Sequence, residues 1–346
     1  MPKIAIIGTT IWGTTLGVVL AHKGLEVRLW ARTKKEASKL RNTGPDPTLL
    51  PNIAFPSQLS ITSSLSEALA DVEAIILAVP SQTMRHNMKL ASKHLNASML
   101  IVSAAKGLEI GSNKRMSLVI AEEIEPRYRS NICALSGPNL SREILQNLPA
   151  ATVAAAWDEA ISRKTQKLLT TKNFCIYTNT DIVGVELGGA LKNVIALGAG
   201  IADGLGYGDN AKAAFITRGL TEITALGVSL GANPITFSGL AGLGDLIATC
   251  ASPLSRNHYV GVELTKGRSL EEITASMVGV AEGVSTTIAA WKLSQQMGLE
   301  MPITERIYQV LYAGVDPRQA AVELMAAEAR HELSGRKWKL SSFLKH

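Results

Sequence analysis

The amino-acid sequence predicts an α/β fold in which a doubly wound, mostly parallel sheet is followed by an all-helical domain. Three observations carry this prediction. In the first half of the chain, short apolar runs alternate with segments of helical periodicity, which is typical of βαβ units. A glycine-rich turn joins the first apolar run to the first helical segment. After about Asp181 the strand-like runs stop, and helical segments follow one another.

Several apolar runs of the first half lack polar alternation, which is typical of strands that helices cover on both faces. The expected strands are Lys3–Ile7, Glu26–Trp30, Ala74–Val79, Met99–Ala104, Ile132–Leu135, Thr152–Ala156 and Phe174–Tyr177. The clearest helical segments between them are Thr14–Lys23, Lys114–Glu123 and Asp158–Thr170.

The second half of the chain is expected to be helical throughout. Its expected helices are Ile182–Ala202, Lys212–Leu230, Asp245–Thr249, Leu270–Ser276, Val284–Met297, Ile303–Tyr312 and Asp316–Ala329. The change of pattern predicts one domain over residues 1–180, a second over residues 181–333, and a basic tail over residues 334–346.

The first helix of the second half, Ile182–Ala202, is apolar enough to raise the question of a membrane span. It contains Glu186 and Lys192, and a charge at the centre of a span costs about 2.5–3.5 kcal/mol on insertion scales. We therefore expect a buried helix and no membrane span.

Composition and charge exclude several classes of function. The chain has 346 residues, of which 46% are hydrophobic, and a net charge of +6, part of it in the basic tail. We find neither a basic stripe nor a nucleic-acid reader motif, and no metal-ligand spacing. The three cysteines, Cys133, Cys175 and Cys250, are expected to be buried reduced thiols. The N-terminus lacks a secretory signal, so a cytoplasmic location is expected.

The turn after the first expected strand reads Gly8-Thr9-Thr10-Ile11-Trp12-Gly13. In a dinucleotide-binding loop the first glycine allows a tight turn, the last allows close packing of helix and strand, and the helix N-terminus faces the pyrophosphate. Thr10 stands where the middle glycine belongs, so the match is partial. The loop predicts a Rossmann-like domain that holds a dinucleotide, and an ordinary βα turn is the alternative.

The end of the second strand bears on which dinucleotide is bound. NAD enzymes usually place an acid there, and the residues after Trp30 include Arg32 but no acid. Arg32 could meet the 2′-phosphate of NADP, which favours NADP over NAD. The alternative is a basic turn exposed to solvent.

Two lysines stand where structural reasons alone do not explain them. Lys106 follows the strand that ends at Ala104, and ligands of parallel sheets bind outside the carboxyl ends of the strands. Lys192 follows Gly188 and Gly189 inside an apolar helix. Burial lowers the pKa of a lysine, as a general acid or base near neutral pH requires. The alternative is a lysine whose amine reaches solvent.

A glycine-rich turn ends in Gly244 and Asp245, and polar residues follow at Thr249 and over 255–257. Asp245 could be a helix cap, and the triplet Ser255, Arg256 and Asn257 a polar loop. Together they supply hydroxyl, carboxylate, guanidinium and amide groups, which suit a phosphorylated polyol.

These segments, in this order and spacing, resemble the NAD(P)-dependent glycerol-3-phosphate dehydrogenase family of the bacterial biosynthetic type, from Ile4 to about Glu328. The segments that carry the resemblance are Ala105–Glu109, Leu135–Pro138, Glu186–Ala196, Leu240–Leu246, Ser255–Asn257 and Glu300–Thr304.

The resemblance implies reversible hydride transfer between NAD(P)H and dihydroxyacetone phosphate, giving sn-glycerol 3-phosphate for glycerophospholipid synthesis. It implies that Lys192 is the catalytic proton donor and acceptor, assisted by Lys106 and Asp245. The substrate-binding positions it implies are Lys106, Gly137, Asn139, Lys192, Asn193, Asp245, Thr249, Ser255, Arg256 and Asn257. The cofactor-binding positions are Gly8, Thr10, Ile11, Trp12, Gly13, Arg32, Lys106, Ser141, Arg256, Val280 and Glu282.

The family pattern usually has Gly-Ala-Gly-Ser-Trp/Tyr-Gly in the cofactor loop, so Thr9, Thr10 and Ile11 depart from it, as does Asn139 after Gly-Pro. Two other functions remain open: a related two-domain reductase of a 3-hydroxy acid or of ketopantoate, and a non-catalytic descendant with weak cofactor binding. A homodimer is the expected assembly, and a small phosphorylated molecule the expected partner.

Overall fold

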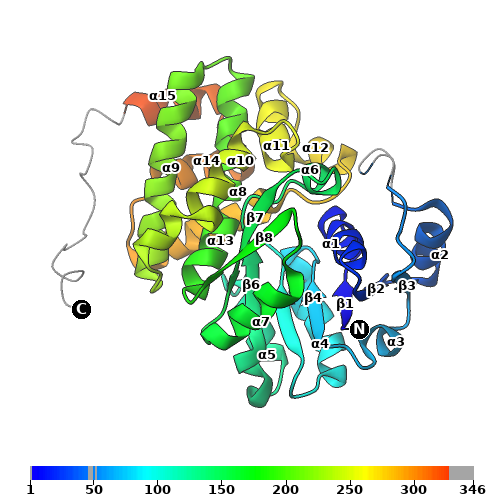
Figure 1. The fold of residues 1–346 in the computed structure, drawn as a ribbon. Coiled ribbons are helices and arrows are strands. Elements are labelled where there is room, and N and C mark those ends of the chain that lie inside the picture. Colours follow the sequence, from blue (N-terminus) through cyan, green and yellow to red (C-terminus); the bar gives the residue numbers. More distant parts are fainter. Residues whose placement is uncertain (1, 46–49, 51–52, 327–346) are drawn as a thin grey trace.

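A computed structural model describes residues 2–45, 50 and 53–326 of the chain. The described residues form one eight-stranded sheet in the order β3-β2-β1-β4-β5-β6-β7-β8, with helices on both faces, followed by a helical region (Figure 1). Its strands are β1 (Lys3–Ile7), β2 (Glu26–Trp30), β3 (Leu59–Thr62), β4 (Ala74–Leu77), β5 (Leu100–Ser103), β6 (Ile132–Ser136), β7 (Ala150–Ala155) and β8 (Phe174–Asn179).

Strands β3 to β6 are parallel, and β7 runs antiparallel to β6 and parallel to β8. The mostly parallel sheet predicted from the sequence is therefore confirmed. Ile7 at the end of β1 lies opposite both Trp30 of β2 and Leu77 of β4. The strand order reverses between β1 and β4, and ligands of doubly wound sheets bind at such a switch point.

Helices α1 to α7 accompany the sheet. They are α1 (Ile11–His22), α2 (Lys34–Thr43), α3 (Leu65–Leu69), α4 (Met84–Ala91), α5 (Met116–Glu123), α6 (Ser141–Leu145) and α7 (Glu159–Leu169). The helices after β8 are α8 (Ile182–Gly204), α9 (Asp209–Ser229), α10 (Asp245–Ala251), α11 (Arg256–Thr265), α12 (Leu270–Ser276), α13 (Glu282–Met297), α14 (Pro302–Tyr312) and α15 (Pro317–Ala326).

Helix α8 is the centre of the helical region. It is long and apolar enough to cross a membrane, but 94% of its apolar window is buried inside the protein, as predicted. Its glycines let other backbones come close: a Cβ on Gly200 would lie 2.1 Å from the carbonyl oxygen of His258 in α11. The buried charge of Glu186 is paired with Arg115, 2.7 Å away. The helix is therefore a core element with its charges paired inside the protein.

The sequence missed several short or polar elements. Strand β3 has only four residues, one of them exposed, and α2 carries five charged residues in ten, so neither shows a clear apolar period. One prediction about the cysteines is wrong: Cys133 and Cys250 are buried, but Cys175 is exposed. Side chains of β8 point alternately to the two faces of the sheet, and the face to which Cys175 points is open to solvent at this strand. The predicted basic tail lies outside the described residues.

Glu222 of α9 holds the start of α14 in place. Its buried carboxylate accepts hydrogen bonds from the backbone N–H groups of Ile303 (2.6 Å) and Thr304 (3.1 Å), and from the Thr304 hydroxyl. A negative group at a helix N-terminus also interacts favourably with the helix dipole. One side chain thus joins two helices of the core.

We predict that Glu222→Ala lowers the free energy of unfolding by about 3 kcal/mol, because it leaves buried N–H donors unpaired. Urea denaturation followed by circular dichroism measures the change. Glu305→Ala, at an exposed position of α14, is the control and should change stability by less than about 0.5 kcal/mol. Equal stability losses in the two variants would contradict the assigned role of Glu222.

Candidate active site

Two lysines from different parts of the chain share one buried carboxylate. Lys192 donates a hydrogen bond from Nζ to Oδ1 of Asp245 at 2.5 Å, and Lys106 donates from Nζ to Oδ2 at 2.7 Å. The Asp245 side chain is 2% exposed, and those of Lys192 and Lys106 are 7% and 16% exposed. The alternative of a Lys192 amine that reaches bulk solvent is therefore wrong. The cluster carries a net positive charge in a nearly dry site.

Each member of the cluster comes from a different element. Lys106 follows β5, Lys192 lies in the middle of α8, and Asp245 is the first residue of α10 after a wide helical turn, Leu240–Gly244. Thr249 fixes the arrangement, because its hydroxyl donates to the Asp245 carbonyl (2.6 Å) and accepts from Lys192 (2.5 Å). The cluster therefore forms only when the sheet and the helical region meet.

Small residues on α8 make that meeting possible. A Cβ on Gly189 would lie 2.1 Å from the Ser136 hydroxyl at the end of β6. A Cβ on Gly188 would lie 2.6 Å from the carbonyl oxygen of Ala241. Both contacts are closer than carbon atoms tolerate, so any larger side chain would push β6 or the turn before α10 away from Lys192.

Burial sets the protonation of Lys106. Loss of solvation lowers its pKa to about 8; the Asp245 charge opposes this shift, and the nearby Lys192 charge adds to it. Lys106 also donates to the Gly137 carbonyl at 2.6 Å. Lys106 therefore keeps its charge at neutral pH but loses it in mildly alkaline solution.

A chain of amides links the cluster to three helices. The Asn193 side-chain amide donates to the carbonyl oxygen of Lys106 (3.2 Å), and its oxygen accepts from the Asn257 amide (2.9 Å). The Asn257 oxygen in turn accepts from the backbone N–H of Gly283 at the start of α13 (2.9 Å). Asn193 and Asn257 thus link α8, α11 and α13 to one another and to the loop that carries Lys106.

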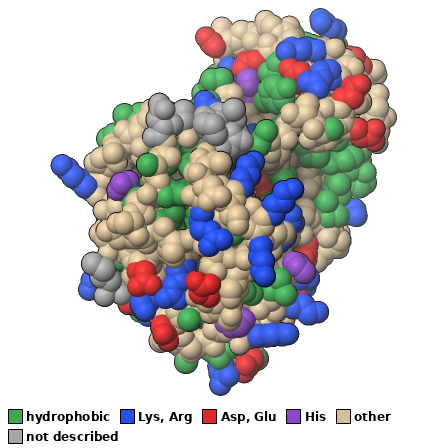
Figure 2. Space-filling model, turned by 90° about the vertical axis from the view of Figure 1, so that its right-hand side faces the viewer, with side chains coloured by type: hydrophobic (Ala, Val, Ile, Leu, Met, Phe, Trp, Pro, Cys, Tyr) green, Lys and Arg blue, Asp and Glu red, His purple; other side chains and the backbone are tan. Residues whose placement is uncertain are grey.

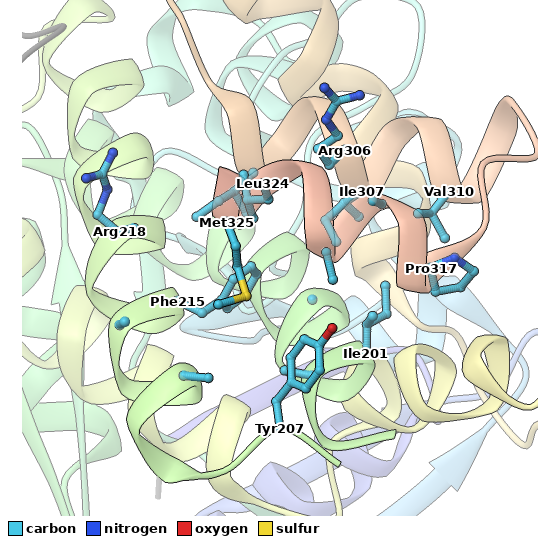
Figure 3. Close-up of a pocket in the computed structure, with 17 residues that line it drawn as sticks. Ile201, Tyr207, Phe215, Arg218, Arg306, Ile307, Val310, Pro317, Leu324 and Met325 are labelled. Atoms are coloured by element: carbon cyan, nitrogen blue, oxygen red, sulfur yellow. The ribbon is translucent and has the colours of Figure 1, made fainter. Parts of the chain in front are cut away.

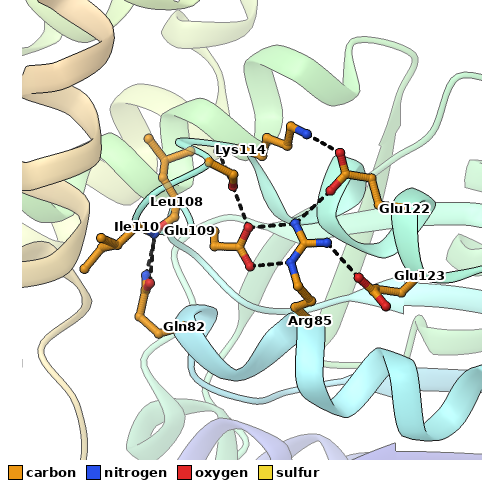
Figure 4. A network of polar contacts seen from close by, with 9 residues as sticks. Gln82, Arg85, Leu108, Glu109, Ile110, Lys114, Glu122 and Glu123 are labelled. Atoms are coloured by element: carbon orange, nitrogen blue, oxygen red, sulfur yellow. Dashed lines mark hydrogen bonds and ion pairs between the residues drawn. The ribbon is translucent and has the colours of Figure 1, made fainter.

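A second network anchors the Lys106 loop from the side of the sheet (Figure 4). Gln82, just after β4, donates to the carbonyl oxygen of Leu108 (2.7 Å) and accepts from the N–H of Ile110 (2.9 Å). Arg85 of α4 binds both oxygens of Glu109 at 2.8 Å, with further ion pairs to α5. The loop that carries Lys106 is therefore fixed on both sides.

Glu282 of α13 connects the helical region to the sheet through hydrogen bonds. Its carboxylate accepts from the Ser81 backbone N–H (2.9 Å) and from the Ser81 hydroxyl. Burial raises the pKa of Glu282, since loss of solvation outweighs these hydrogen bonds. Gly107 leaves room for this contact, because a Cβ there would lie 2.5 Å from the Ser81 hydroxyl. The predicted cofactor residue Glu282 thus lies beside the loop of the predicted catalytic Lys106.

The loop after β1 has the shape of a dinucleotide cradle. Gly8 has a φ of +109°, and a Cβ there would lie 2.7 Å from the carbonyl oxygen of Ala78. A Cβ on Gly13 would lie 2.2 Å from the Gly8 carbonyl oxygen. Both positions therefore need glycine, for the two reasons expected of such a loop: a tight turn and close packing of helix on strand.

Thr10 fits at the middle position because its backbone is extended and its side chain turns under the loop. Its hydroxyl donates to the Ala78 carbonyl (2.7 Å) and accepts from the Gly13 N–H (3.0 Å), so Thr10 caps α1. Trp12 packs edge-on against Phe174, with its ring directed to the sheet. The N–H groups of Ile11 and Trp12 begin the helix and have no partner within it.

The remaining predicted residues lie around this junction. Ser255 caps α11 by accepting from the His258 N–H (3.2 Å), and Arg256 is exposed, with its guanidinium beside Gly279. The Asn139 amide donates to the Thr152 hydroxyl (3.1 Å), and its oxygen is buried with no partner among the described residues. The other positions are Ser141 at the start of α6, Val280 just before α13, and Arg32 at the end of β2, the last two exposed.

The surface over this junction is basic. Figure 2 shows one face of the molecule, on which Lys and Arg side chains gather near the middle, where the two lobes meet. A positive field of this kind raises the local concentration of anions such as phosphate esters and dinucleotides.

Sequence reasoning missed three residues of the site region: Ser81, Gln82 and Glu36. The first two follow β4 directly, so the rule that ligands bind beyond the carboxyl ends of parallel strands could have found them. Glu36 lies in the first turn of α2, a helix that was not predicted, and accepts hydrogen bonds from Thr9 and Arg32. An acid within reach of the cofactor loop is therefore present after all.

A separate cavity of about 250 Å³ lies between α8, α9, α14 and α15 (Figure 3). Apolar side chains such as Ile201, Phe215 and Leu324 line it, with Arg218 and Arg306 among its few polar residues. Arg306 is paired with Glu323 at 2.9 Å. None of the predicted site residues lines this cavity, so it lies apart from the lysine cluster.

Comparisons with known proteins agree with the resemblance in the sequence. Two family models match: "NAD-dependent glycerol-3-phosphate dehydrogenase N-terminus" over residues 3–162, and the corresponding C-terminus over residues 181–322. A protein of Dehalococcoides mccartyi named glycerol-3-phosphate dehydrogenase (NAD(P)+) is 64% identical over 341 residues, which cover 98% of this chain and 95% of that one.

Solved structures give the same result. Glycerol-3-phosphate dehydrogenase from Coxiella burnetii has a TM-score of 0.88 and 35% identity, covering 94% of this chain and 98% of that one. A ketopantoate reductase from Ralstonia eutropha, at 14% identity and a TM-score of 0.58, covers 93% of this chain and 99% of that one, and shares the fold alone.

We predict that Asp245→Asn lowers the free energy of unfolding by about 3 kcal/mol at pH 7, because two buried lysine charges lose their counter-charge. Asp245 raises the pKa of Lys106, which burial lowers to about 8, so in the variant Lys106 gives up its proton at a lower pH than in the wild type, whereas an unfolded lysine holds it to about pH 10.4. The deficit relative to wild type should therefore shrink as the pH rises from 7 to about 8. Denaturant titrations across that range measure it.

Asp203→Asn is the matched control, because Asp203 also bridges two basic groups, Lys212 and His258, but its side chain is 28% exposed. We expect a loss of less than about 1 kcal/mol there. A loss for Asp245→Asn no larger than for Asp203→Asn would mean that the lysines are not held charged in the native site.

Proposed function

Because the chain belongs to the NAD-dependent glycerol-3-phosphate dehydrogenase family, we propose that the cluster of Lys106, Lys192 and Asp245 is the active site at which it interconverts glycerol 3-phosphate and dihydroxyacetone phosphate. The chain is an oxidoreductase that uses NAD or NADP. The observation that carries the assignment of the site is the pair of buried lysines that share one carboxylate.

Lys192 is the proposed general acid in the direction of ketone reduction. Its ammonium group donates a proton to the oxygen on C2 as negative charge develops there, and the positive charge of Lys106 stabilises that oxygen. Asp245 holds both amines and offsets one of their two charges. In the reverse direction Lys192 accepts the proton from the C2 hydroxyl.

The cradle at Gly8, Thr10 and Gly13 fits a dinucleotide, because both glycines lie where a Cβ would strike backbone. The bound nicotinamide supplies or accepts the hydride at C2. The residues that we propose to hold the dinucleotide are Gly8, Thr10, Ile11, Trp12, Gly13, Arg32, Lys106, Ser141, Arg256, Val280 and Glu282. Ile11 and Trp12 act through their backbone N–H groups, which suit the pyrophosphate.

Arg256 is the proposed phosphate ligand of the substrate, since the residue is exposed and its guanidinium, although near the charge of Glu282, makes no hydrogen bond within the described part of the chain. Binding energy at the phosphate positions the ketone for reaction at C2. Asn193 and Asn257 already use most of their amide capacity within the protein, so they act mainly by holding the site together. Gly137, Asn139, Thr249 and Ser255 complete the proposed substrate site.

The two alternatives raised by the sequence differ in substrate or in cofactor binding. A reductase of ketopantoate or of a 3-hydroxy acid would reduce a ketone that lacks phosphate faster than dihydroxyacetone phosphate. A non-catalytic descendant would hold NADH and NADPH only weakly. The two family models and the 64% identity to a protein named glycerol-3-phosphate dehydrogenase support the dehydrogenase instead. The fit of Thr10 as a helix cap supports a working cofactor loop.

We also propose a division into domains at residues 1–180 and 181–333, a homodimer, and a cytoplasmic role in glycerophospholipid synthesis. The end of β8 at Asn179 and the start of α8 at Ile182 support the division. Analytical ultracentrifugation tests the assembly.

We predict that the protein oxidises NADH or NADPH when dihydroxyacetone phosphate is added, and that Lys192→Ala lowers kcat by about a thousandfold, because the proton donor is lost. Absorbance at the nicotinamide band measures turnover. Lys212→Ala is the control, a lysine paired with Asp203 at 2.8 Å, and should keep its kcat. A Lys192→Ala variant with at least a tenth of the normal kcat would overturn the role of Lys192.

We predict that kcat/KM for ketone reduction falls as the pH rises above about 8. Burial lowers the pKa of Lys106 to about 8, so its charge, which favours the developing alkoxide, is present below that pH and lost above it. Rate measurements between pH 6 and pH 10 test this. Lys106→Arg should remove the decline, since arginine stays protonated. A wild-type profile that stays flat to pH 10 would contradict the prediction.

A further inference from the structure

The Glu36 carboxylate lies where the loop after β1 meets the end of β2. It accepts a hydrogen bond from the Thr9 hydroxyl through Oε1, and from the Arg32 backbone N–H through Oε2 at 3.1 Å. The backbone N–H of Glu36 donates to the Thr33 hydroxyl at 3.1 Å, which caps α2. Glu36 is half-buried, so the carboxylate is fixed in place but still reachable by a ligand.

This position is the adenosine end of the proposed cofactor site. In Rossmann folds the ribose next to adenine lies beyond the carboxyl end of β2, where an acid accepts hydrogen bonds from its hydroxyls. No acid follows β2 directly in this chain. We propose that Glu36, from helix α2, has this role. Its carboxylate accepts a hydrogen bond from the ribose 2′-hydroxyl of NAD and repels the 2′-phosphate of NADP. The inference rests on the cofactor placement proposed above.

A purely structural capping role does not account for the contact with Thr9. Glu272 of α12 returns to the Ser269 backbone N–H in a closed capping box. Glu67 of α3 accepts from the Thr62 hydroxyl, five residues away at the end of β3. Glu36 reaches instead across 27 residues to Thr9, the residue after the first glycine of the cofactor loop.

The basic residues around Glu36 make its negative charge important for the choice between NAD and NADP. Arg32, Lys34 and Lys35 form an exposed basic turn around it. These cations attract a 2′-phosphate, whereas the carboxylate repels it at short range, and one unit charge at about 4 Å changes a binding constant by about fivefold even in bulk water. Removing the charge of Glu36 leaves only cations at this place.

The test is Glu36→Gln, which keeps the side-chain shape and one oxygen acceptor but removes the charge. We expect the ratio of kcat/KM for NADPH to that for NADH to rise about tenfold, mostly through KM, with kcat within twofold of wild type. Thr9→Val, which frees the carboxylate without changing charge, should raise the same ratio by roughly threefold.

Glu159→Gln is the matched control, because it removes a glutamate from the first turn of a helix, α7, that packs against β8 at the opposite edge of the sheet. It should leave the ratio unchanged. Calorimetric titration with NADH, NADPH, adenosine 5′-monophosphate and adenosine 2′,5′-bisphosphate measures binding without turnover. In Glu36→Gln, the affinity for adenosine 2′,5′-bisphosphate divided by the affinity for adenosine 5′-monophosphate should be about tenfold higher than in the wild type.

Two failures can be told apart. If the wild-type protein binds both dinucleotides but Glu36→Gln leaves the ratio within twofold, the role of Glu36 is wrong and the proposed function stands. If the wild-type protein binds neither dinucleotide nor adenosine 5′-monophosphate, the cofactor placement itself is wrong, and this inference falls with it.

Discussion

The carboxylate of Asp245 between the amines of Lys106 and Lys192 is the interaction on which the arrangement of the molecule depends. Two ammonium groups this close repel each other strongly in a dry site, and burial lowers the pKa of Lys106. One carboxylate bound to both amines opposes that shift and offsets their repulsion. Because the three groups come from β5, α8 and α10, the sheet and the helical region must be held together to within hydrogen-bond distance.

That requirement explains why α8 is both apolar and rich in small residues. A helix that carries Lys192 into the core must be covered on nearly every side, and its backbone must approach β6, the turn before α10, and α11. Gly188, Gly189 and Gly200 lie at these three contacts. The same composition that resembles a membrane span in the sequence is therefore what a helix buried at the centre of the protein needs. The pairing of Glu186 with Arg115 offsets part of the cost of burying the other charge on this helix.

The sequence predicted the elements that have strong periodicity and no competing signal. The bounds of β1, β2 and α12 were predicted to the residue, since turn residues or a capping serine flank each of them. Strand β3 and helices α2 and α11 were not predicted, because four residues show no period and polar helices resemble loops. Lys106, Lys192 and Asp245 were found individually, but only the fold shows that they share hydrogen bonds. Glu36 was missed for the same reason as α2.

The sheet and the helical region each contribute residues to the proposed active site, and polar contacts join the two regions. The loops of the sheet supply the cofactor cradle and Lys106, whereas the helical region supplies Lys192 and Asp245. Ser81 with Glu282, Lys106 with Asp245, and the Lys106 carbonyl with Asn193 cross the junction. Polar contacts demand precise distances and angles, whereas apolar surfaces tolerate sliding. A junction built from directional bonds therefore holds Lys192, the proposed proton donor, at a fixed position relative to the sheet and its proposed cofactor cradle, as transfer of a hydride and a proton to adjacent atoms of one substrate requires.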